Sequence, residues 1–237
     1  MRSFLKSAAQ VAVAVAALAG AGGATAAPYP DEPQMRAAIA QAADLVRAEG
    51  LEVQALDAIK EGVRQPLMAA GIHLASGVCR IYFNTRPEDG LTQFFASLDE
   101  SDMPVWLAAI AVHEASHCIE QREAYVRLRF EKVLPAHIMR GDMNVQGYSS
   151  VVKSGAVETW GEALADIASV LYLKKVQPER WTHFAHGIAT MRENLARKWP
   201  QHDTSAWLRN MIAANPDIGG ESVFEAAFEL RRRFRPQ

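Results

Sequence analysis

Two histidines and a glutamate near the middle of the chain have the residue types and the spacing of a metal-dependent hydrolytic site. His113, Glu114 and His117 lie in the segment His113-Glu114-Ala115-Ser116-His117. Helix residues four positions apart project from the same face, so the two imidazoles can bind one cation at the ~2.0–2.1 Å N–metal distance of zinc sites. Glu114 lies next to His113, where its carboxylate can take a proton from a zinc-activated water that attacks a carbonyl. The motif therefore predicts a zinc-dependent hydrolase with Glu114 as the general base.

The third protein ligand has to come from elsewhere in the chain, because a catalytic zinc usually has three protein ligands and one open position. Glu158, Glu162 and Asp166 follow one another at four-residue steps, which places all three on one face of a later predicted helix. His183 and His186, on the next predicted helix, are alternative ligands. A ligating histidine usually donates its second ring N–H to a carboxylate, so two acids one turn apart could supply a ligand and that acceptor.

The segment 160–166 resembles the E-x-x-x-D element of the gluzincins, the thermolysin-like and aminopeptidase-like zinc metallopeptidases. The resemblance covers this segment and the H-E-x-x-H motif. It implies that Glu162 is the third Zn²⁺ ligand and that Asp166 orients His113 through its second ring nitrogen. It also implies a zincin-like fold and a peptide or protein substrate. We therefore favour Glu162 over Glu158 as the ligand.

Another group of zinc peptidases, the metzincins, continues the motif with a glycine and a third histidine. This chain has Glu120 at the glycine position and Glu123 at the histidine position. Without the glycine the helix continues, and Glu123 would point away from the two histidines. We therefore exclude the metzincin ligand set.

Two residues could stabilise the negative charge that develops on a carbonyl oxygen during hydrolysis. Tyr148 lies in a glycine-containing segment before the acidic helix, and His202 precedes a predicted helix start. We name His202 as a catalytic candidate; an ordinary surface position is the alternative for either residue. Because this assignment is weak, a second hypothesis stays open: a metal-containing module that binds a peptide or protein without cleaving it.

The spacing of apolar residues predicts an α+β fold that is predominantly helical. A small sheet would lie over the helix that carries the motif, and residues 105–112 of that helix would be buried beneath the site. The strand 78–83 could be an edge strand that pairs with an extended peptide, or it could simply cover the helix that carries His113. The expected helices are 35–48, 51–70, 101–129, 156–175, 178–198, 204–214 and 221–233, with a hairpin over 72–83 that turns at Gly77 and an irregular stretch over 133–154.

The N-terminal residues 1–26 have the order of a secretory signal: Arg2 and Lys6, then an Ala- and Val-rich run, then an Ala-Thr-Ala cleavage signal. The apolar run is shorter than the ~20 residues that span a bilayer, so we expect no membrane anchor after cleavage. Residues 27–237 would form a single zincin-like domain, periplasmic or secreted. Cleavage leaves 23 basic and 27 acidic side chains, a net charge of −4, which argues against a nucleic-acid partner.

Cys79 and Cys118 are the two cysteines of the sequence. An exported protein can form a disulfide, although both residues could instead be buried thiols. We favour a bridge, which would clamp the strand that contains Cys79 beside the metal helix, because Cys118 directly follows His117. The basic residues at 231–235 are interpreted as a helix end that complements the helix dipole.

Overall fold

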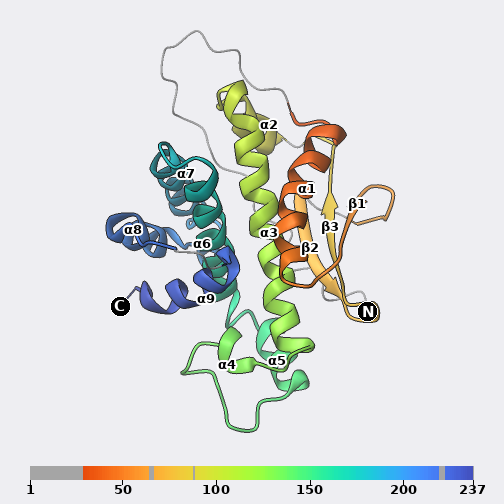
Figure 1. Cartoon of the computed structure of the whole chain (residues 1–237), viewed down its shortest axis with the longest axis vertical. Coiled ribbons are helices and arrows are strands. Elements are labelled where there is room, and N and C mark those ends of the chain that lie inside the picture. The colour runs from red at the N-terminus through yellow and green to blue at the C-terminus, as the bar shows by residue number, and fades with distance from the viewer. Residues whose placement is uncertain (1–28, 64–66, 88, 219–221, 237) are drawn as a thin grey trace.

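The computed structural model describes residues 29–63, 67–87, 89–218 and 222–236. Within them the chain forms an α+β fold in which helices predominate and three strands form one small sheet (Figure 1). The strands are β1 (Val53–Asp57), β2 (Met68–His73) and β3 (Val78–Phe83). The helices are α1 (Glu32–Ala48), α2 (Asp89–Ala96), α3 (Met103–Tyr125), α4 (Phe130–Val133), α5 (Val145–Lys153), α6 (Glu158–Val176), α7 (Trp181–Leu195), α8 (Ser205–Ala214) and α9 (Val223–Arg233), with 3-10 turns at Glu100–Asp102 and Pro200–His202. The predicted secretory signal lies outside the described residues.

Helix α3 carries the H-E-x-x-H motif and runs through the centre of the molecule, between α1 on one side and α6 on the other (Figure 1). Pro104 lies in its first turn, where a missing backbone N–H costs nothing because that group has no partner within a helix. The residues 105–112 are buried or half-buried, as predicted. A helix with neighbours on several sides buries apolar residues all round, which explains this continuous apolar run.

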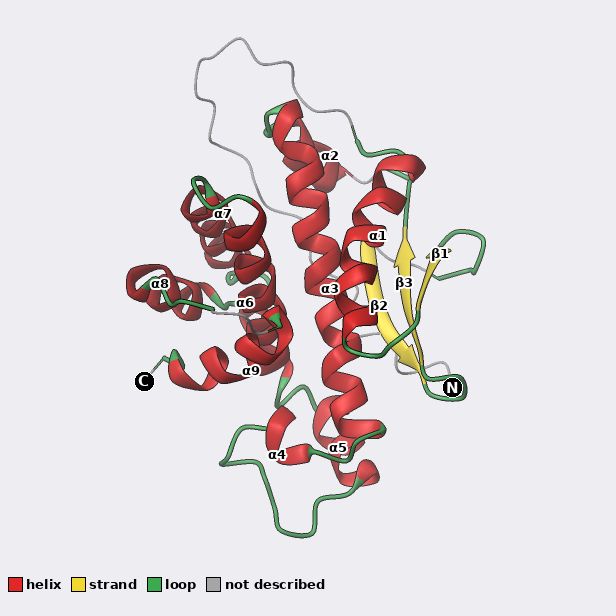
Figure 2. Cartoon of the chain, viewed as in Figure 1, coloured by secondary structure: helices red, strands yellow, loops and turns green. Residues whose placement is uncertain are grey.

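The three strands lie on one side of α3 (Figure 2). Their order is β1-β3-β2, and β3 pairs parallel with β1 and antiparallel with β2. The predicted hairpin is confirmed: β2 and β3 are joined by a turn in which Gly77 has a φ of +70°, a conformation that favours glycine. Strand β2 packs directly against α3, so the sheet covers the helix that carries the motif.

The prediction of a helix over residues 51–70 is wrong, because this stretch contains β1 and the start of β2. The carboxylate of Asp57 accepts two backbone N–H groups of the turn that follows β1, and Gly62 has a φ of +66°. These features end the strand and reverse the chain. The strand β1 is hydrogen-bonded to β3, which lies far from it in the sequence. A local pattern of apolar residues cannot reveal such a distant partner.

Of the two alternatives for strand 78–83, the edge strand is wrong, because β3 is the central strand with neighbours on both sides. The strand beside the motif is β2, and side chains of α3 already accept hydrogen bonds from its backbone. The N–H of Ala70 donates to the carboxylate of Glu114. The N–H of Ile72 donates to Oε1 of Gln121, 2.8 Å away. An extended peptide therefore could not pair with β2 at these two positions without displacing α3 side chains.

The C-terminal half is helical, as predicted, although the sequence did not predict the helices α4 and α5. Residues 145–153 form α5, within the stretch predicted to be irregular; Asn144 caps it by accepting the N–H of Gly147 at 2.9 Å. The interpretation of 231–235 as a helix-end cluster is confirmed, because Arg231, Arg232 and Arg233 lie in the last turn of α9. Arg231 is in addition fully buried. Arg231 donates to Oε1 of Glu120 at 2.7 Å and so ties α9 to α3.

No helix among the described residues combines the length and apolar character that a membrane span requires.

Cys79 of β3 and Cys118 of α3 form a disulfide, as favoured from the sequence. Both residues are fully buried, and the bond joins the central strand to the helix position that follows His117. The closed loop spans a sequence separation of 39 residues. A cross-link of this kind reduces the conformational entropy of the unfolded chain.

We expect the double variant Cys79→Ala/Cys118→Ala to lower the free energy of unfolding by about 2–4 kcal/mol. Urea denaturation followed by circular dichroism measures this change. A thiol reductant should destabilise the wild type by a similar amount and leave the double variant unchanged. A wild type whose stability does not respond to the reductant would contradict the prediction.

Candidate metal centre

Side chains from α3 and α6 bring three donor groups together at the interface between these two helices. Nε2 of His113 lies 3.5 Å from Oε2 of Glu162, and Nε2 of His117 lies 3.7 Å from Oε1 of the same carboxylate. The donor atoms of all three residues lie within 4.8 Å of one another. Tetrahedral ligands at ~2.0–2.1 Å from one ion are roughly 3.4 Å apart, which these separations approach. The group could therefore hold a metal ion.

The hydrogen bonding at this point fits a bound cation. Nε2 of His113 is buried and finds no hydrogen-bond partner among the described residues. A buried polar atom without a partner costs about 1–3 kcal/mol, and a metal bound to Nε2 would remove that cost. The second ring nitrogen, Nδ1, lies 2.8 Å from Oδ1 of Asp166. A proton on Nδ1 leaves Nε2 free as the metal ligand, which is the arrangement predicted for Asp166.

Glu114 is almost completely buried beside the two histidines, with 1% of its surface exposed. Burial raises the pKa of its carboxyl group to about 8. The backbone N–H of Ala70 on β2 holds the carboxylate in place. Its Oε2 is buried and finds no hydrogen-bond partner in the described part of the chain. This environment suits a general base that exchanges protons near neutral pH.

Arg192 of α7 binds the two acids on α6 and is fully buried. Its Nε and Nη2 donate to the two carboxylate oxygens of Asp166, each at 2.7 Å. Nη2 also donates to Oε2 of Glu162 at 3.0 Å. The hydroxyl of Thr204 donates to Asp166 as well and does not cap α8. This network fixes the orientation of both acids with respect to the histidines.

Arg192 was not predicted from the sequence, although the sequence carried a signal for it. The buried side of α7 is formed by residues at helical spacing that include Trp181, Phe184, Ile188 and Leu195. Arg192 follows Ile188 by four positions and therefore lies on the same apolar face. An arginine is rarely fully buried unless it is paired. Its position predicts a buried acid but does not reveal which one.

His202 lies within the site, so a surface position is wrong for this residue. It is buried; its Nε2 lies 2.9 Å from Oε1 of Glu158, and its Nδ1 lies 3.4 Å from Oε2 of Glu162. Both ring nitrogens thus face carboxylates. This geometry favours a role in holding Glu162 over the predicted role in stabilising an oxyanion.

The other candidates from the sequence do not join the site. His183 and His186 are exposed on the outer face of α7. Tyr148 is buried in α5, where its ring packs edge-on against Tyr125 with a centroid distance of 5.2 Å. None of these side chains belongs to the group that could hold a metal in the described residues.

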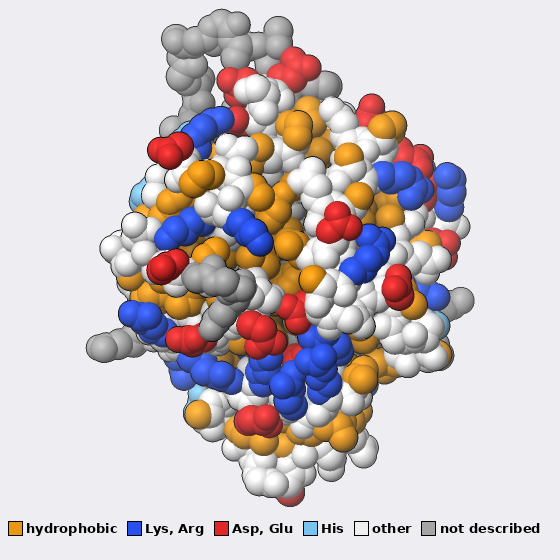
Figure 3. Space-filling model, in the orientation of Figure 1, with side chains coloured by type: hydrophobic (Ala, Val, Ile, Leu, Met, Phe, Trp, Pro, Cys, Tyr) orange, Lys and Arg blue, Asp and Glu red, His pale blue; other side chains and the backbone are white. Residues whose placement is uncertain are grey.

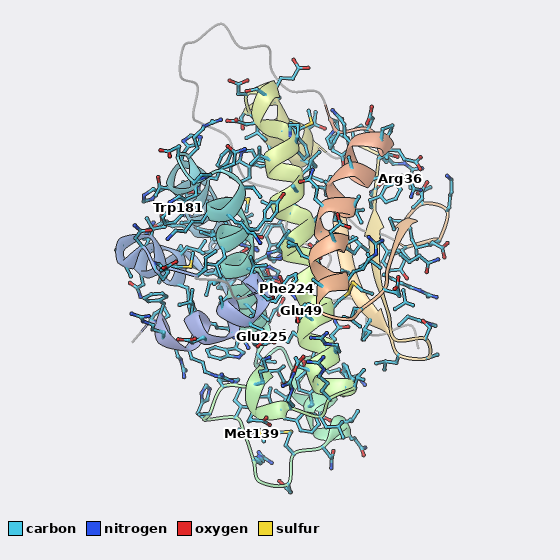
Figure 4. The ribbon with its side chains drawn as sticks, in the orientation of Figure 1. Arg36, Glu49, Met139, Trp181, Phe224 and Glu225 are labelled. Carbon is cyan, nitrogen blue, oxygen red and sulfur yellow. A yellow bond between two sulfur atoms is a disulfide. The ribbon has the colours of Figure 1, made fainter. Side chains whose placement is uncertain are left out.

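Glu123, at the position where metzincins have their third histidine, belongs to a separate charged cluster. It is fully buried and pairs with Arg122 at 3.0 Å, with Arg127 at 3.1 Å and with Arg129. Arg122 also donates to the backbone carbonyl of Glu49, whose side chain lies beside α3 at the end of α1 (Figure 4). Basic side chains gather on this face above α4 and α5 (Figure 3). Glu123 lies outside the group formed by His113, His117 and Glu162.

Opposing influences give the ligand groups different protonation states in the metal-free protein. Burial lowers the pKa of His113, but the hydrogen bond to Asp166 and the nearby carboxylate of Glu162 outweigh it and raise the pKa to about 10. Burial lowers the pKa of His117 to about 4. Burial favours the neutral form of Glu162, but the positive charge of Arg192 holds its pKa well below the usual range. At neutral pH, His113 is therefore protonated, His117 is neutral and Glu162 is ionised.

Metal binding at pH 7 is expected to release at least one proton, because a metal binds the neutral imidazole and His113 is protonated below its pKa of about 10. The apparent affinity should consequently rise with pH, by about tenfold per unit between pH 6 and pH 8. Calorimetric titration with Zn²⁺ in two buffers of different ionisation enthalpy measures the proton release. The exposed His183→Ala variant should behave as the wild type does. An affinity that stays constant over this pH range would contradict the prediction.

No protein-family model matches the chain, and no curated protein or solved structure matches it either.

Proposed function

We propose that this protein is a zinc-dependent peptidase with a gluzincin-like ligand set and a zincin-like fold. The observation that carries the proposal is the convergence of His113, His117 and Glu162 on one point, with the buried carboxylate of Glu114 beside it. Two imidazoles and one carboxylate fit Zn²⁺ and leave a fourth coordination position open, which is typical of catalytic zinc sites.

Each residue of the site has a chemical task in this proposal. When bound, zinc polarises a carbonyl group and lowers the pKa of a water molecule that it coordinates. Glu114 accepts the proton of the attacking water and delivers it to the amine that leaves. Asp166 keeps the proton of His113 on Nδ1. Arg192 holds Asp166 and Glu162 in position through three hydrogen bonds.

One observation favours the alternative of a module that binds a metal and a peptide without catalysis. His202 was the candidate for oxyanion stabilisation, and both of its ring nitrogens face carboxylates instead. A peptidase built on this site would therefore depend on the metal itself, or on a donor other than His202, to stabilise the oxyanion.

We also propose that the protein acts outside the cytoplasm, in the periplasm or after secretion. The disulfide between Cys79 and Cys118 supports this location, since such bonds persist in oxidising compartments. The signal-like order of residues 1–26 supports it independently.

The proposal is tested by metal analysis and a peptide-cleavage assay on the exported protein. We expect one zinc ion per chain, cleavage of peptides from a mixed library, loss of cleavage after chelation and recovery when Zn²⁺ is added. Bound zinc without cleavage of any peptide would favour the binding module. A chain that binds no metal, with His113→Ala indistinguishable from the wild type, would refute both.

A further inference from the structure

The turn that follows α3 contains a leucine that neither the backbone nor the core accounts for. Leu128 has a φ of +55°, in the left-handed conformation that glycine or asparagine usually takes at a helix end. A bulky residue in this conformation is an outlier and costs free energy. The side chain is 55% exposed, so packing in the core does not offset that cost. Because strained positions of this kind are concentrated at functional sites, Leu128 indicates a role for this surface.

The turn 126–129 and Val145 together form an apolar tip of the molecule. Val126 is 59% exposed and Val145, the first residue of α5, is 38% exposed. With the leucine of the turn, they are three of the six large apolar side chains that are exposed in the described part of the chain. Tyr148 of α5 packs against Tyr125, directly before the turn, with a ring centroid distance of 5.2 Å. The two segments therefore lie side by side, at the lower end of the molecule beside α4 (Figure 1).

Arginine side chains flank the leucine of the tip on both sides. Arg127 and Arg129 have side chains that are 42% and 41% exposed. Both bind the carboxylate of Glu123, which is fully buried and also pairs with Arg122. Arg122 in turn meets Glu49 at 3.5 Å. Two carboxylates thus face three guanidinium groups, which leaves a net positive charge, and the two exposed arginines present it at the surface.

The sequence around the tip is basic in a chain that is acidic as a whole. Residues 126–145 contain four basic side chains, Arg127, Arg129, Lys132 and Arg140, and two acidic ones, Glu131 and Asp142. Their net charge is therefore +2, whereas the whole chain has a net charge of −2. In Figure 3, basic side chains gather over this end of the molecule, with apolar side chains below them. The tip thus combines exposed apolar groups with a local positive charge.

We propose that the tip binds reversibly to an anionic membrane surface. The three exposed apolar side chains enter the boundary between the lipid head groups and the acyl chains, where they lose their contact with water. Arg127 and Arg129, next to the leucine, lie at the level of the lipid phosphates and are attracted by the negative surface potential. An anionic lipid surface therefore satisfies both features of the tip. The inference does not depend on the proposed peptidase function.

The test is co-sedimentation of the exported protein with vesicles of phosphatidylcholine alone, or of phosphatidylcholine mixed with an equal amount of phosphatidylglycerol. We expect the wild type to bind the anionic vesicles at least about tenfold more strongly, and added salt to weaken this binding. Leu128→Gly should lower the partition coefficient by about tenfold, because it removes a leucine side chain that lipid buries. The matched control is Leu74→Gly, the same substitution at a leucine that is 57% exposed in the turn between β2 and β3. It should bind as the wild type does.

Thermal melting separates loss of the lipid contact from loss of the fold. Glycine adopts a positive φ readily, so Leu128→Gly should melt no lower than the wild type while it binds vesicles more weakly. If this variant does not fold, Val126→Ser tests the same surface, with the same expected direction. Equal binding of the wild type and the folded tip variant would show that another segment binds the lipid, and would overturn the inference.

The contribution of charge is tested with Arg140→Gln, at an exposed position in the loop before α5. We expect this variant to bind anionic vesicles about fivefold more weakly and neutral vesicles as the wild type does. Lys175→Gln, at an exposed position near the end of α6, is the control and should leave both unchanged. A wild type that binds neither kind of vesicle, or that binds both equally well, would refute the proposed recognition of an anionic surface.

Discussion

Replacing Glu114 with glutamine is expected to abolish peptide cleavage while zinc remains bound. The amide matches the carboxylate in shape and can still accept the N–H of Ala70, so the site should keep its geometry. It cannot take a proton from the attacking water. Loss of a general base typically lowers the rate by about 10²–10⁴-fold. The measurement is kcat/KM on the best peptide from the library, together with the zinc content of the variant.

The control for Glu114→Gln is Glu179→Gln, the same substitution at an exposed glutamate just before α7. It should retain full activity and full zinc content. A Glu114→Gln protein that still cleaves at the wild-type rate would show that another residue is the base, or that the activity belongs to a contaminant. A variant that loses zinc would show that Glu114 is itself a ligand.

Replacement of Glu162 should weaken zinc binding far more than the same replacement of Glu158, one turn earlier on α6. Oxygen atoms of Glu162 lie 3.5 Å and 3.7 Å from the Nε2 atoms of the two motif histidines. Glu158 instead accepts a hydrogen bond from His202. Loss of a residue that supports a metal ligand without binding the metal itself costs about 10–100-fold in metal affinity. We therefore expect Glu162→Ala to lower the zinc affinity by more than about 100-fold and Glu158→Ala to lower it by less.

Competition with a chelator of known affinity measures both zinc dissociation constants. Because Glu162→Ala leaves the buried charge of Arg192 with one partner fewer, the variant could lose stability for reasons unrelated to zinc. Glu162→Gln keeps the side-chain volume and an acceptor for Arg192, and it separates the two effects. A larger loss of affinity for the Glu158 variant would overturn the ligand assignment.

Helix geometry explains why half of the candidate site could be predicted. His113, Glu114 and His117 belong to one helix, and the helical repeat alone places the two imidazoles on one face. The acid pair Glu162 and Asp166 followed from the same repeat together with the resemblance to the gluzincins. The disulfide was favoured because Cys118 follows His117 directly, and the structure forms it.

Two errors have a shared physical cause, because strand pairing is not local. The apolar pattern of residues 51–70 fits a helix, but the backbone of β1 finds its hydrogen-bond partners in β3. The same pairing makes β3 central and leaves β2 beside α3. A strand is stabilised by partners that a short window of sequence does not contain.

The sequence by itself determined the helix that carries the motif, the residue types of the centre and the predominantly helical α+β class. Only the tertiary structure decided which acid meets the histidines and which cation holds that acid. These depend on how α6 and α7 pack against α3, and so on contacts between residues far apart in the chain. Glu162 reaches His113, and Arg192 joins Glu162 to Asp166, because whole helices pack face to face. Spacing along one helix is fixed by bond geometry, whereas the placement of one helix on another follows from the shape of the entire core.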